Sequence, residues 1–463
     1  MPPLPPLPAS TGHADWQRPA LRVWASETAA QLRQHEALHE AGAYALSPLM
    51  LPRQQMQGMQ GQVHQLLQLA RRLSLQLDAE GRWCRADQRS LVLAARERGP
   101  ALAPIARPDG ILVEGQLKLL ELNLDSGLGW YFELEFAQQR AAQLNTMAWG
   151  GRHRVPRLWP AICNYVAQLM ACRDKRRCRL VVLIDAQLGD YDRRHAQLFA
   201  NRLNASLPGL NASVRCTEEL HCSGTSLRDR AGPVDIVWRF ASLAHEAART
   251  ASTLALLQRA LRCDCLLASD PSDLGVESKL ALAALSELAE HESPLLSTDE
   301  RQLVNALVPW TRVLRPAEQD STDGDLSTLA LEQRRSLVLK RTHSRASLHV
   351  LIGCECSDAQ WQQAIAKAKA DTLPWVLQQN VSPTPLPFAF VGDSRSELLG
   401  YSVSPFVFGS AEAAPYVRIE RNAEQRRLAV GDARLNGICA TLLVDEPASI
   451  AHLAQPPAAA EHV

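Results

Sequence analysis

The sequence of 463 residues lacks net charge, since 49 Lys and Arg balance 49 Asp and Glu, and it lacks long apolar runs. Neutrality argues against a protein whose main partner is nucleic acid or an anionic membrane surface. No run of ~18 apolar residues occurs, so we expect no membrane-spanning helix. The Pro-rich start, Met1–Pro8, has neither the charged nor the apolar segment of a signal peptide. These absences favour a cytoplasmic protein.

Motifs of several common protein classes are also missing. The eleven cysteines are odd in number and scattered, which argues against a disulfide framework and fits a reducing compartment. The close pairs Cys263/Cys265 and Cys354/Cys356 lack the Cys-x-x-Cys spacing of a zinc knuckle. No Walker A loop and no Gly-x-Ser-x-Gly elbow occur, which removes two large enzyme classes.

Lysine is scarce, because only six of the 49 basic residues are lysines and the rest are arginines. In such a chain, a lysine at a structurally defined position suggests a need for a compact ammonium group. Lys279 begins an apolar helix, and Lys340 ends the apolar strand 336–340. An ammonium group at such a position suits phosphate oxygens. Two ordinary surface cations are the alternative interpretation.

The order of patterns along the chain predicts a mixed α/β (α+β) protein. Hydrophobic residues make up 46% of the sequence, enough for a buried core. Strands at 179–186, 212–216 and 234–238, with a helix at 190–203, favour a parallel α/β layer. We expect the following segments: a disordered tail (1–14), a helical N-terminal region (15–100), a segment with a metal-binding hairpin (101–150), an α/β subdomain (151–275), a nucleotide-binding clamp (276–446) and a C-terminal tail (447–463).

A hairpin near residue 115 carries the most specific polar pattern. Residues two apart in a strand point to the same face, so Glu121 and Asn123 project together. Asp109, at the head of the partner strand, can add a third oxygen across the hairpin. Three oxygen donors with two formal charges suit Mg²⁺ held jointly by protein and nucleotide phosphates. A solvated hairpin face with ordinary polar alternation is the alternative.

Together these motifs resemble the circularly permuted ATP-grasp ligases, the branch that includes the glutathionylspermidine synthase domain. The resemblance covers about residues 105 to 443 and rests on these segments: Arg107-x-Asp109, Leu120-Glu-Leu-Asn123, the helix that starts at Ser278-Lys279, Val308-Pro-Trp-Thr-Arg312, Leu337–Lys340, Trp375–Gln378 and Tyr416-Val-Arg418. It implies a permuted ATP-grasp fold, and an ATP- and Mg²⁺-dependent ligase that joins a small carboxylic acid to an amine through an acyl phosphate.

The resemblance also implies roles for individual residues. Arg107, Lys279 and Arg418 would be catalytic, and Asp109, Glu121 and Asn123 would bind the metal ion. Contacts to ATP would come from these residues: Lys279, Lys340, Trp375, Leu377, Gln378 and Gln379. An amino acid, a peptide or a polyamine would be the substrate, a homo-oligomer is compatible with this function, and neither nucleic acid nor membrane would be a partner.

Two departures from the family pattern leave a second function open. The family has a glycine-rich flap after its lysine, whereas this chain has no glycine from Arg341 to Ile352. The hinge reads Gln378-Gln379 where the family has Gln-Glu. In one interpretation His343 and Arg345, together with Arg341, replace the flap as side-chain cations that contact the phosphates. In the other, turnover is lost and the protein binds a ligand or partner.

Three further patterns have weaker functional interpretations. His35-Glu-Ala-Leu-His39 matches the zinc motif His-Glu-x-x-His, but its polar surroundings favour a chance match on a surface helix. The basic run 173–179 is interpreted as a solvated turn, with RNA contact as the alternative. Arg239 follows a predicted strand and is a candidate anchor for a substrate carboxylate, or an ordinary surface arginine.

Overall fold

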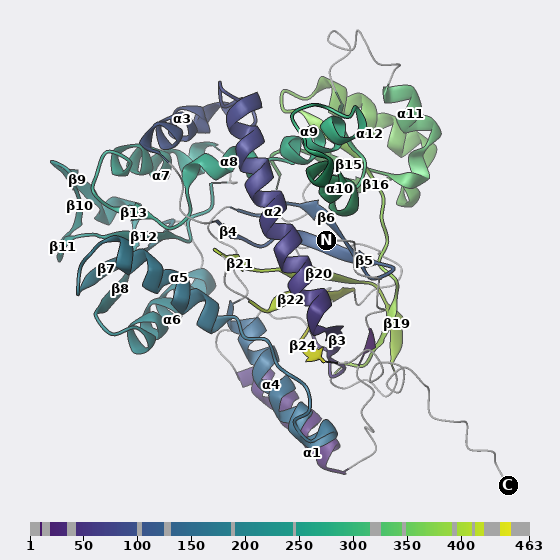
Figure 1. The fold of residues 1–463 in the computed structure, drawn as a ribbon, viewed down its shortest axis with the longest axis horizontal. Helices are drawn as coiled ribbons and strands as arrows, with labels where there is room; N and C mark the ends of the chain where they lie inside the picture. The colour runs from purple at the N-terminus through teal and green to yellow at the C-terminus, as the bar shows by residue number, and fades with distance from the viewer. Residues whose placement is uncertain are drawn as a thin grey trace.

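The chain folds into a mixed α/β protein, which confirms the predicted fold class (Figure 1). A computed structural model describes the following residues: 10–11, 19–34, 43–99, 104–124, 131–186, 190–243, 247–314, 326–344, 349–390, 396–409, 413–420 and 436–445. No helix within these ranges is long and apolar enough to cross a membrane.

One unit of the fold is the predicted parallel α/β layer. Its sheet has the order β13-β12-β7-β8, and every neighbouring pair of strands is parallel. The strands are β7 (Cys178–Ile184), β8 (Leu210–Cys216), β12 (Ile236–Arg239) and β13 (Leu266–Leu267). The helices of this unit are α5 (Trp159–Cys172), α6 (Asp190–Ser206) and α7 (Ala247–Ala260). β7 is apolar throughout because a central parallel strand is covered on both faces.

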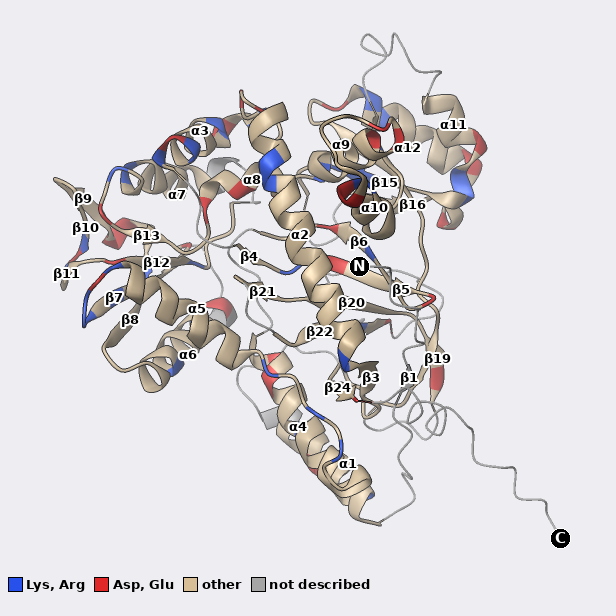
Figure 2. Cartoon of the chain, viewed as in Figure 1, with Lys and Arg blue, Asp and Glu red and all other residues tan. Residues whose placement is uncertain are grey.

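A small antiparallel sheet, which the sequence did not predict, extends this unit. Its strands are β9 (His221–Ser223), β10 (Ser226–Asp229) and β11 (Gly232–Pro233). Figure 2 shows positive and negative residues intermixed here. Three of the five basic residues in the run 173–179 have acidic partners, in the pairs Arg173–Asp264, Lys175–Asp235 and Arg179–Asp229. These ion pairs favour the interpretation of the run as a structural turn over RNA contact.

The helical region predicted for 15–100 contains three helices: α1 (Pro19–Gln34), α2 (Arg53–Leu77) and α3 (Arg89–Arg98). The long α2 crosses the middle of the molecule, and α1 packs with α4 (Tyr131–Trp149) in a projecting arm (Figure 1). The motif His35–His39 lies in the segment 35–42, outside the described residues. The structure therefore does not test whether this motif is a zinc site or a chance match.

Early and late parts of the chain share the central sheets. The strands β2 (Ala43–Tyr44) and β3 (Leu49–Pro52) pair in parallel with β23 (Asn436–Cys439) and β24 (Thr441–Val444). The other partners are β1 (Ser10–Thr11), β20 (Tyr401–Pro405) and β22 (Pro415–Glu420). Strand β1 corrects the prediction that residues 1–14 are only a disordered tail, because main-chain pairing with β3 orders Ser10 and Thr11.

The predicted hairpin lies against these late strands. It consists of β5 (Asp109–Val113) and β6 (Gln116–Glu121), and β5 packs against β20. Its turn residues Glu114 and Gly115 have φ of 49° and 80°, as two-residue hairpin turns require. A short pair, β4 (Ile105–Ala106) with β21 (Val407–Phe408), repeats this contact of early with late chain.

A four-stranded antiparallel sheet, β14-β17-β15-β16, forms the remaining unit. Its strands are β14 (Thr311–Leu314), β15 (Leu337–Arg341), β16 (Val350–Ile352) and β17 (Trp375–Gln379). The helices are α8 (Leu274–Glu277), α9 (Lys279–Glu290), α10 (Thr298–Leu307), α11 (Leu326–Glu332) and α12 (Asp358–Ala370). The predicted capping box of α12 is present, since Ser357 and Gln360 exchange backbone-to-side-chain hydrogen bonds. A hairpin of β18 (Leu386–Phe388) and β19 (Glu397–Leu399) follows.

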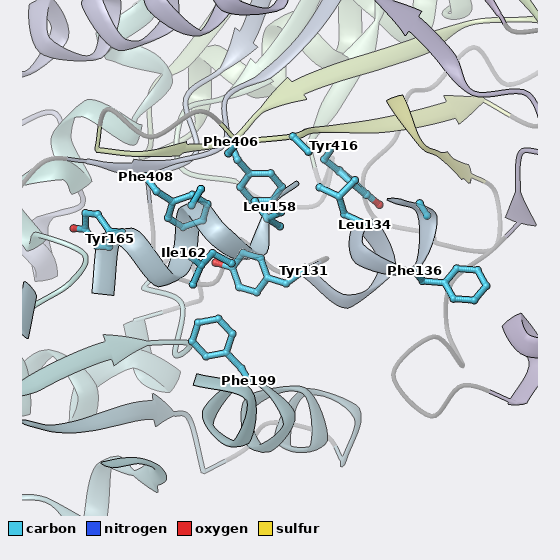
Figure 3. Packing of buried hydrophobic residues seen from close by; sticks show 14 of the residues in the cluster. Tyr131, Leu134, Phe136, Leu158, Ile162, Tyr165, Phe199, Phe406, Phe408 and Tyr416 are labelled. Carbon is cyan, nitrogen blue, oxygen red and sulfur yellow. The ribbon is translucent and has the colours of Figure 1, made fainter. Parts of the chain in front are cut away.

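An aromatic core joins the parallel unit to the central strands (Figure 3). Tyr131 at the start of α4 stacks on Phe199 of α6 at 5.4 Å between ring centroids. The same ring lies 5.8 Å from Phe406 and 6.5 Å from Phe408. Because rings from three separate segments fill one core, the parallel unit and the central strands are held as a packed body.

Candidate active site

The hairpin brings the three predicted oxygen donors to one end. Asp109 and Glu121 are opposite each other in the β5–β6 register, with an irregularity next to Asp109. Asn123 follows β6, and its backbone and that of Arg107 are joined by a hydrogen bond of 2.9 Å. Leu122 and Leu124 are buried between and after them, so the predicted alternation holds. The arrangement places all three side chains at the same end of the hairpin.

Gly110 explains how β5 approaches the late strands. A Cβ atom at this position would lie 2.7 Å from Leu117 Cδ1 and 3.1 Å from the Val403 carbonyl oxygen. A larger residue would therefore push the hairpin away from β20. The neighbouring Asp109 depends on that close approach for its contacts with β20 and β22.

Asp109 is buried between two arginines and a serine. Ser404 Oγ donates a hydrogen bond of 2.9 Å to Asp109 Oδ1, and Arg418 Nη2 lies 3.0 Å from Oδ2. Arg107 Nε lies 3.8 Å from Oδ1. Burial alone would raise the pKa of Asp109, but the guanidinium groups of Arg418 and Arg107 and the hydrogen bonds lower it below its ordinary value. Asp109 is therefore a carboxylate at neutral pH.

The two arginines are embedded in aromatic rings. The Arg107 guanidinium lies 5.5 Å from the ring centroid of Tyr416 and 5.8 Å from that of Phe406. Arg418 lies 5.7 Å from the Tyr416 ring, and its Nε donates to Ser402 Oγ at 3.2 Å. Both side chains are about 95% buried, so their charge is held away from water. Two cations against one carboxylate leave this cluster with a net positive charge.

Lys279 connects the hairpin to α9. Ser278 begins the helix as its N-cap, with a side chain that accepts a hydrogen bond from Leu280 N. Lys279 Nζ lies 3.0 Å from Glu121 Oε2 and donates to the Ser344 carbonyl oxygen at 3.1 Å. The lysine that the sequence singled out thus contacts one of the predicted metal ligands.

Lys340 is also directed toward the hairpin. It lies in β15, where its Nζ donates to Gln378 Oε1 at 2.6 Å and to the Leu120 carbonyl oxygen at 3.4 Å. Gln378 Nε2 in turn donates to Thr311 Oγ1 at 3.1 Å, which fixes the orientation of the amide. Burial lowers the pKa of Lys340 to about 8, Glu121 opposes this shift and Lys279 adds to it.

The side chains predicted on the hinge strand divide between two faces of the sheet. Gln378 shares a face with Lys340, whereas Trp375 and Leu377 pack on the opposite face against Trp361 of α12. Trp375 Nε1 donates to Asp371 Oδ2 at 2.9 Å, and Gln379 is exposed at the end of β17. Of the four residues predicted on this strand, Gln378 is the one that shares a face with Lys340.

The replacement of the missing flap by cationic side chains is not supported at His343. Its ring forms hydrogen bonds with the Trp83 carbonyl oxygen and with Thr342 Oγ1, both at 2.9 Å. Burial lowers the pKa of His343 to about 4, so the ring is neutral at pH 7. Arg341 pairs instead with Asp371 at 3.0 Å, and Arg345 lies outside the described residues. A neutral, hydrogen-bonded ring corrects the expectation that His343 supplies a cation.

Sequence reasoning did not identify the residues that orient these groups. Ser402 is the cross-strand partner of Arg418, and Ser404 lies two residues further along the same face of β20. Thr311 occupies the equivalent position opposite Gln378. Serine and threonine in strands carry no motif, but a Ser-x-Ser pair in an otherwise apolar run was a usable signal for one polar face.

Arg239, the candidate carboxylate anchor, lies at the end of β12 and is buried. Its Nη1 donates to the Ala241 carbonyl oxygen at 3.1 Å. Burial argues against the ordinary surface arginine that was its alternative, since a buried guanidinium needs partners. It belongs to the parallel unit, whereas Glu121, Lys279 and Lys340 meet at the hairpin.

Comparison by sequence gives no match to a family model and no significant match to a curated protein. Comparison by structure matches a glutathione synthetase-like effector from Globodera pallida in its apo form, with a TM-score of 0.58 and 12% identity, over 91% of this chain and 97% of that one. A proposed γ-glutamylcysteine synthetase from Methylobacillus flagellatus matches 81% of this chain and 87% of its own with a TM-score of 0.44 and 15% identity.

A RimK-domain ATP-grasp protein from Sphaerobacter thermophilus matches 59% of this chain and 94% of its own, with a TM-score of 0.27 and 16% identity. This match and that to the Methylobacillus protein are too distant to add to the argument. The effector, in contrast, follows the chain along nearly its whole length. The chain therefore has the fold of this glutathione synthetase-like effector.

Proposed function

We propose that the protein is an ATP-dependent carboxylate–amine ligase that requires Mg²⁺. The observation that carries this proposal is the convergence of Glu121, Lys279, Lys340 and the Arg418 cluster at one end of the β5–β6 hairpin, although they come from four distant parts of the sequence. Three buried cationic groups beside carboxylate and amide oxygens form a site for a polyanion and a divalent cation. The name of the structural relative from Globodera pallida, a glutathione synthetase-like effector, agrees with this class of reaction.

The donor chemistry at the hairpin fits Mg²⁺. Asn123 Nδ2 donates to the Arg107 carbonyl oxygen at 3.1 Å, so its amide is oriented with the oxygen Oδ1 directed away from that bond. Glu121 is 23% exposed, while Lys279 balances its charge. Hard oxygen ligands of this kind are those that Mg²⁺ prefers. We propose Glu121 and Asn123 as ligands, and a bound Mg²⁺ would reduce the negative charge of the ATP phosphates.

The protein's own contribution to the reaction is positioning and electrostatic stabilisation. In the proposed reaction a substrate carboxylate attacks the γ-phosphate of ATP, and ADP leaves. An amine then displaces phosphate from the acyl phosphate, which gives an amide. Lys279, Lys340, Arg107 and Arg418 are cations that need no reorganisation when charge develops on the phosphoryl oxygens. No dedicated base is required for the first step because its nucleophile is already ionised.

Glu121→Gln is the variant that tests the proposal. The wild type should bind ATP with a dependence on Mg²⁺ and release ADP when pooled amino acids, polyamines and small peptides are supplied. Glu121→Gln keeps the shape of the side chain but removes its charge, so ADP release should fall by 100-fold or more. Glu135→Gln is the matched control, because Glu135 on α4 is a partly buried carboxylate paired with Arg202.

The competing function is a homologue without turnover that binds a ligand or partner. It would be supported by a wild type that neither binds millimolar ATP nor releases ADP under any substrate mixture. Equal ADP release by wild type and Glu121→Gln would contradict the proposed site, even if the protein were an enzyme.

A further inference from the structure

The three oxygen donors of the hairpin are not equivalent, and Asp109 differs from the other two. We infer that Asp109 does not bind the metal ion and is instead a positioning residue that holds Arg418 ready for an anion. This inference rests on the proposed function and changes the role that the family resemblance implied for Asp109.

One carboxylate oxygen of Asp109 accepts a hydrogen bond, and the other is in an ion pair but accepts no hydrogen bond among the described residues. Oδ1 accepts the hydrogen bond from Ser404 and Oδ2 lies 3.0 Å from Arg418 Nη2. The residue is about 96% buried, and a second guanidinium, that of Arg107, lies within 4 Å. A divalent cation approaching Asp109 would have to displace an ion pair in a site of low dielectric, beside two positive charges.

Glu121 and Asn123, in contrast to Asp109, have oxygens that are available to a metal ion. Glu121 is partly exposed, and its ion-pair partner among the described residues is Lys279. Asn123 uses its amide nitrogen for the backbone and leaves its oxygen for another group. The proposed Mg²⁺ ligands of the protein are thus Glu121 at the end of β6 and Asn123 just after it, with the remaining positions left for phosphate oxygens and water.

The contacts of Arg418 indicate what Asp109 does. Asp109 holds Nη2 and Ser402 holds Nε, whereas Nη1 is buried without a hydrogen-bond partner among the described residues. A buried guanidinium nitrogen without a hydrogen-bond partner costs free energy unless an anion accepts its hydrogen bond during function. Fixing two of the three nitrogens therefore directs the third at a substrate anion, such as a phosphoryl or carboxylate oxygen.

Mn²⁺ distinguishes the two roles because it is visible by EPR and substitutes for Mg²⁺ at oxygen ligands. We would titrate wild type, Asp109→Asn and Glu121→Gln with the Mn²⁺ complex of a non-hydrolysable ATP analogue, using water-proton relaxation for Kd and EPR for the ion. Asp109→Asn should keep the wild-type EPR spectrum and a Kd within about threefold, while Glu121→Gln should change the spectrum and weaken binding at least about tenfold.

Steady-state ADP release with Mg²⁺ tests the action through Arg418. Asp109→Asn should lower kcat by about 100-fold with KM for ATP within about threefold, because it misorients a charge needed in the transition state. Arg418→Met should lower kcat to the same degree, and the double variant should be no more than about threefold worse than either. Two independent roles would instead multiply to about 10⁴-fold and overturn the inference.

A milder variant covers the case in which Asp109→Asn fails to fold. Ser404→Ala removes only the hydrogen bond to Oδ1, and it should lower kcat about tenfold and leave the Mn²⁺ spectrum unchanged. A changed spectrum in Ser404→Ala, or loss of Mn²⁺ in Asp109→Asn to the degree seen in Glu121→Gln, would mean that Asp109 is a metal ligand. Either result would refute this inference and leave the proposed function unaffected. If the wild type binds no Mn²⁺ nucleotide, the proposed function and this inference fall together.

Discussion

The burial of Lys340 predicts how ATP affinity depends on pH. Its pKa is about 8 because the amine is desolvated and lies near Lys279. Only the protonated amine attracts phosphate, so the nucleotide-free protein at pH 7 is mostly in the binding-competent form and at pH 9 mostly is not. With one group of pKa 8, the protonated fraction falls by about tenfold between these pH values, which corresponds to about 1.4 kcal/mol of binding free energy.

The direction of this pH dependence follows from the linkage between proton binding and ATP binding. Bound phosphate stabilises the charged amine and raises its pKa, so binding takes up a proton at pH values between the free and the bound pKa. Affinity is therefore full below pH 8 and is lost as the pH rises through 8, until the pKa of the bound state is reached. At pH 8 the uptake should be about half a proton for each ATP bound.

Isothermal titration at pH 7, 8 and 9, in buffers of different ionisation enthalpy, measures both quantities. Lys340→Arg is the matched control, because a guanidinium stays charged over this range while every other titrating group is retained. The variant should show weaker binding overall but little of the pH dependence. A wild-type Kd that is constant from pH 7 to 9, or the same slope in Lys340→Arg, would refute a neutralised Lys340 as the cause.

Three further predictions concern the stability of the units around the site. Arg71→Met leaves the buried Asp273 carboxylate without the two hydrogen bonds that Arg71 donates to it, and should lower the free energy of unfolding by about 3–5 kcal/mol in urea titrations. Trp361→Ala empties the core of the β14–β17 sheet and should cost about 3–5 kcal/mol, measured by the same titration. Gly353→Ala would place a Cβ atom 1.9 Å from the Arg334 carbonyl oxygen, and should lower the thermal midpoint by several degrees in calorimetry, about 1–3 kcal/mol. A stable Gly353→Ala protein would show that this turn can shift, and unchanged unfolding of Arg71→Met would show that Asp273 finds another partner.

Local patterns in the sequence predicted most elements near the site. The hairpin, the helix that starts at Lys279 and the strand that ends near Lys340 are present with nearly the expected boundaries. Each has a strong local signal, which is a glycine turn between alternating strands, a serine cap, or an apolar run. Elements of this kind are specified by residues that are close in sequence.

The pairings that complete the site could not be predicted in this way. Asp109 contacts Ser404 only because β5 packs on β20, and no sequence pattern near either residue predicts that contact. Likewise, β2 and β3 are short and have no hydrophobic periodicity, so the sequence does not predict their pairing with strands near residue 440. The low pKa of His343 comes from burial in the folded protein, where its ring contacts the backbone of Trp83, 260 residues away in sequence. Such properties arise from tertiary packing, which overrides the side chain's intrinsic chemistry.

The pairing of β3 with β24 also affects how the protein is made. Leu49 pairs with Thr441, so the edge of β3 remains without this partner until the ribosome has added roughly 390 more residues. At the usual rates of synthesis this delay is about 20 to 80 s, far longer than the folding of a helix such as α2. During that time the nascent chain exposes the apolar edge Leu49–Leu51, which favours pairing with other chains. Fragments that end before β24 should therefore give low yields, and chaperones that shield extended apolar segments should increase the recovery of the full-length protein.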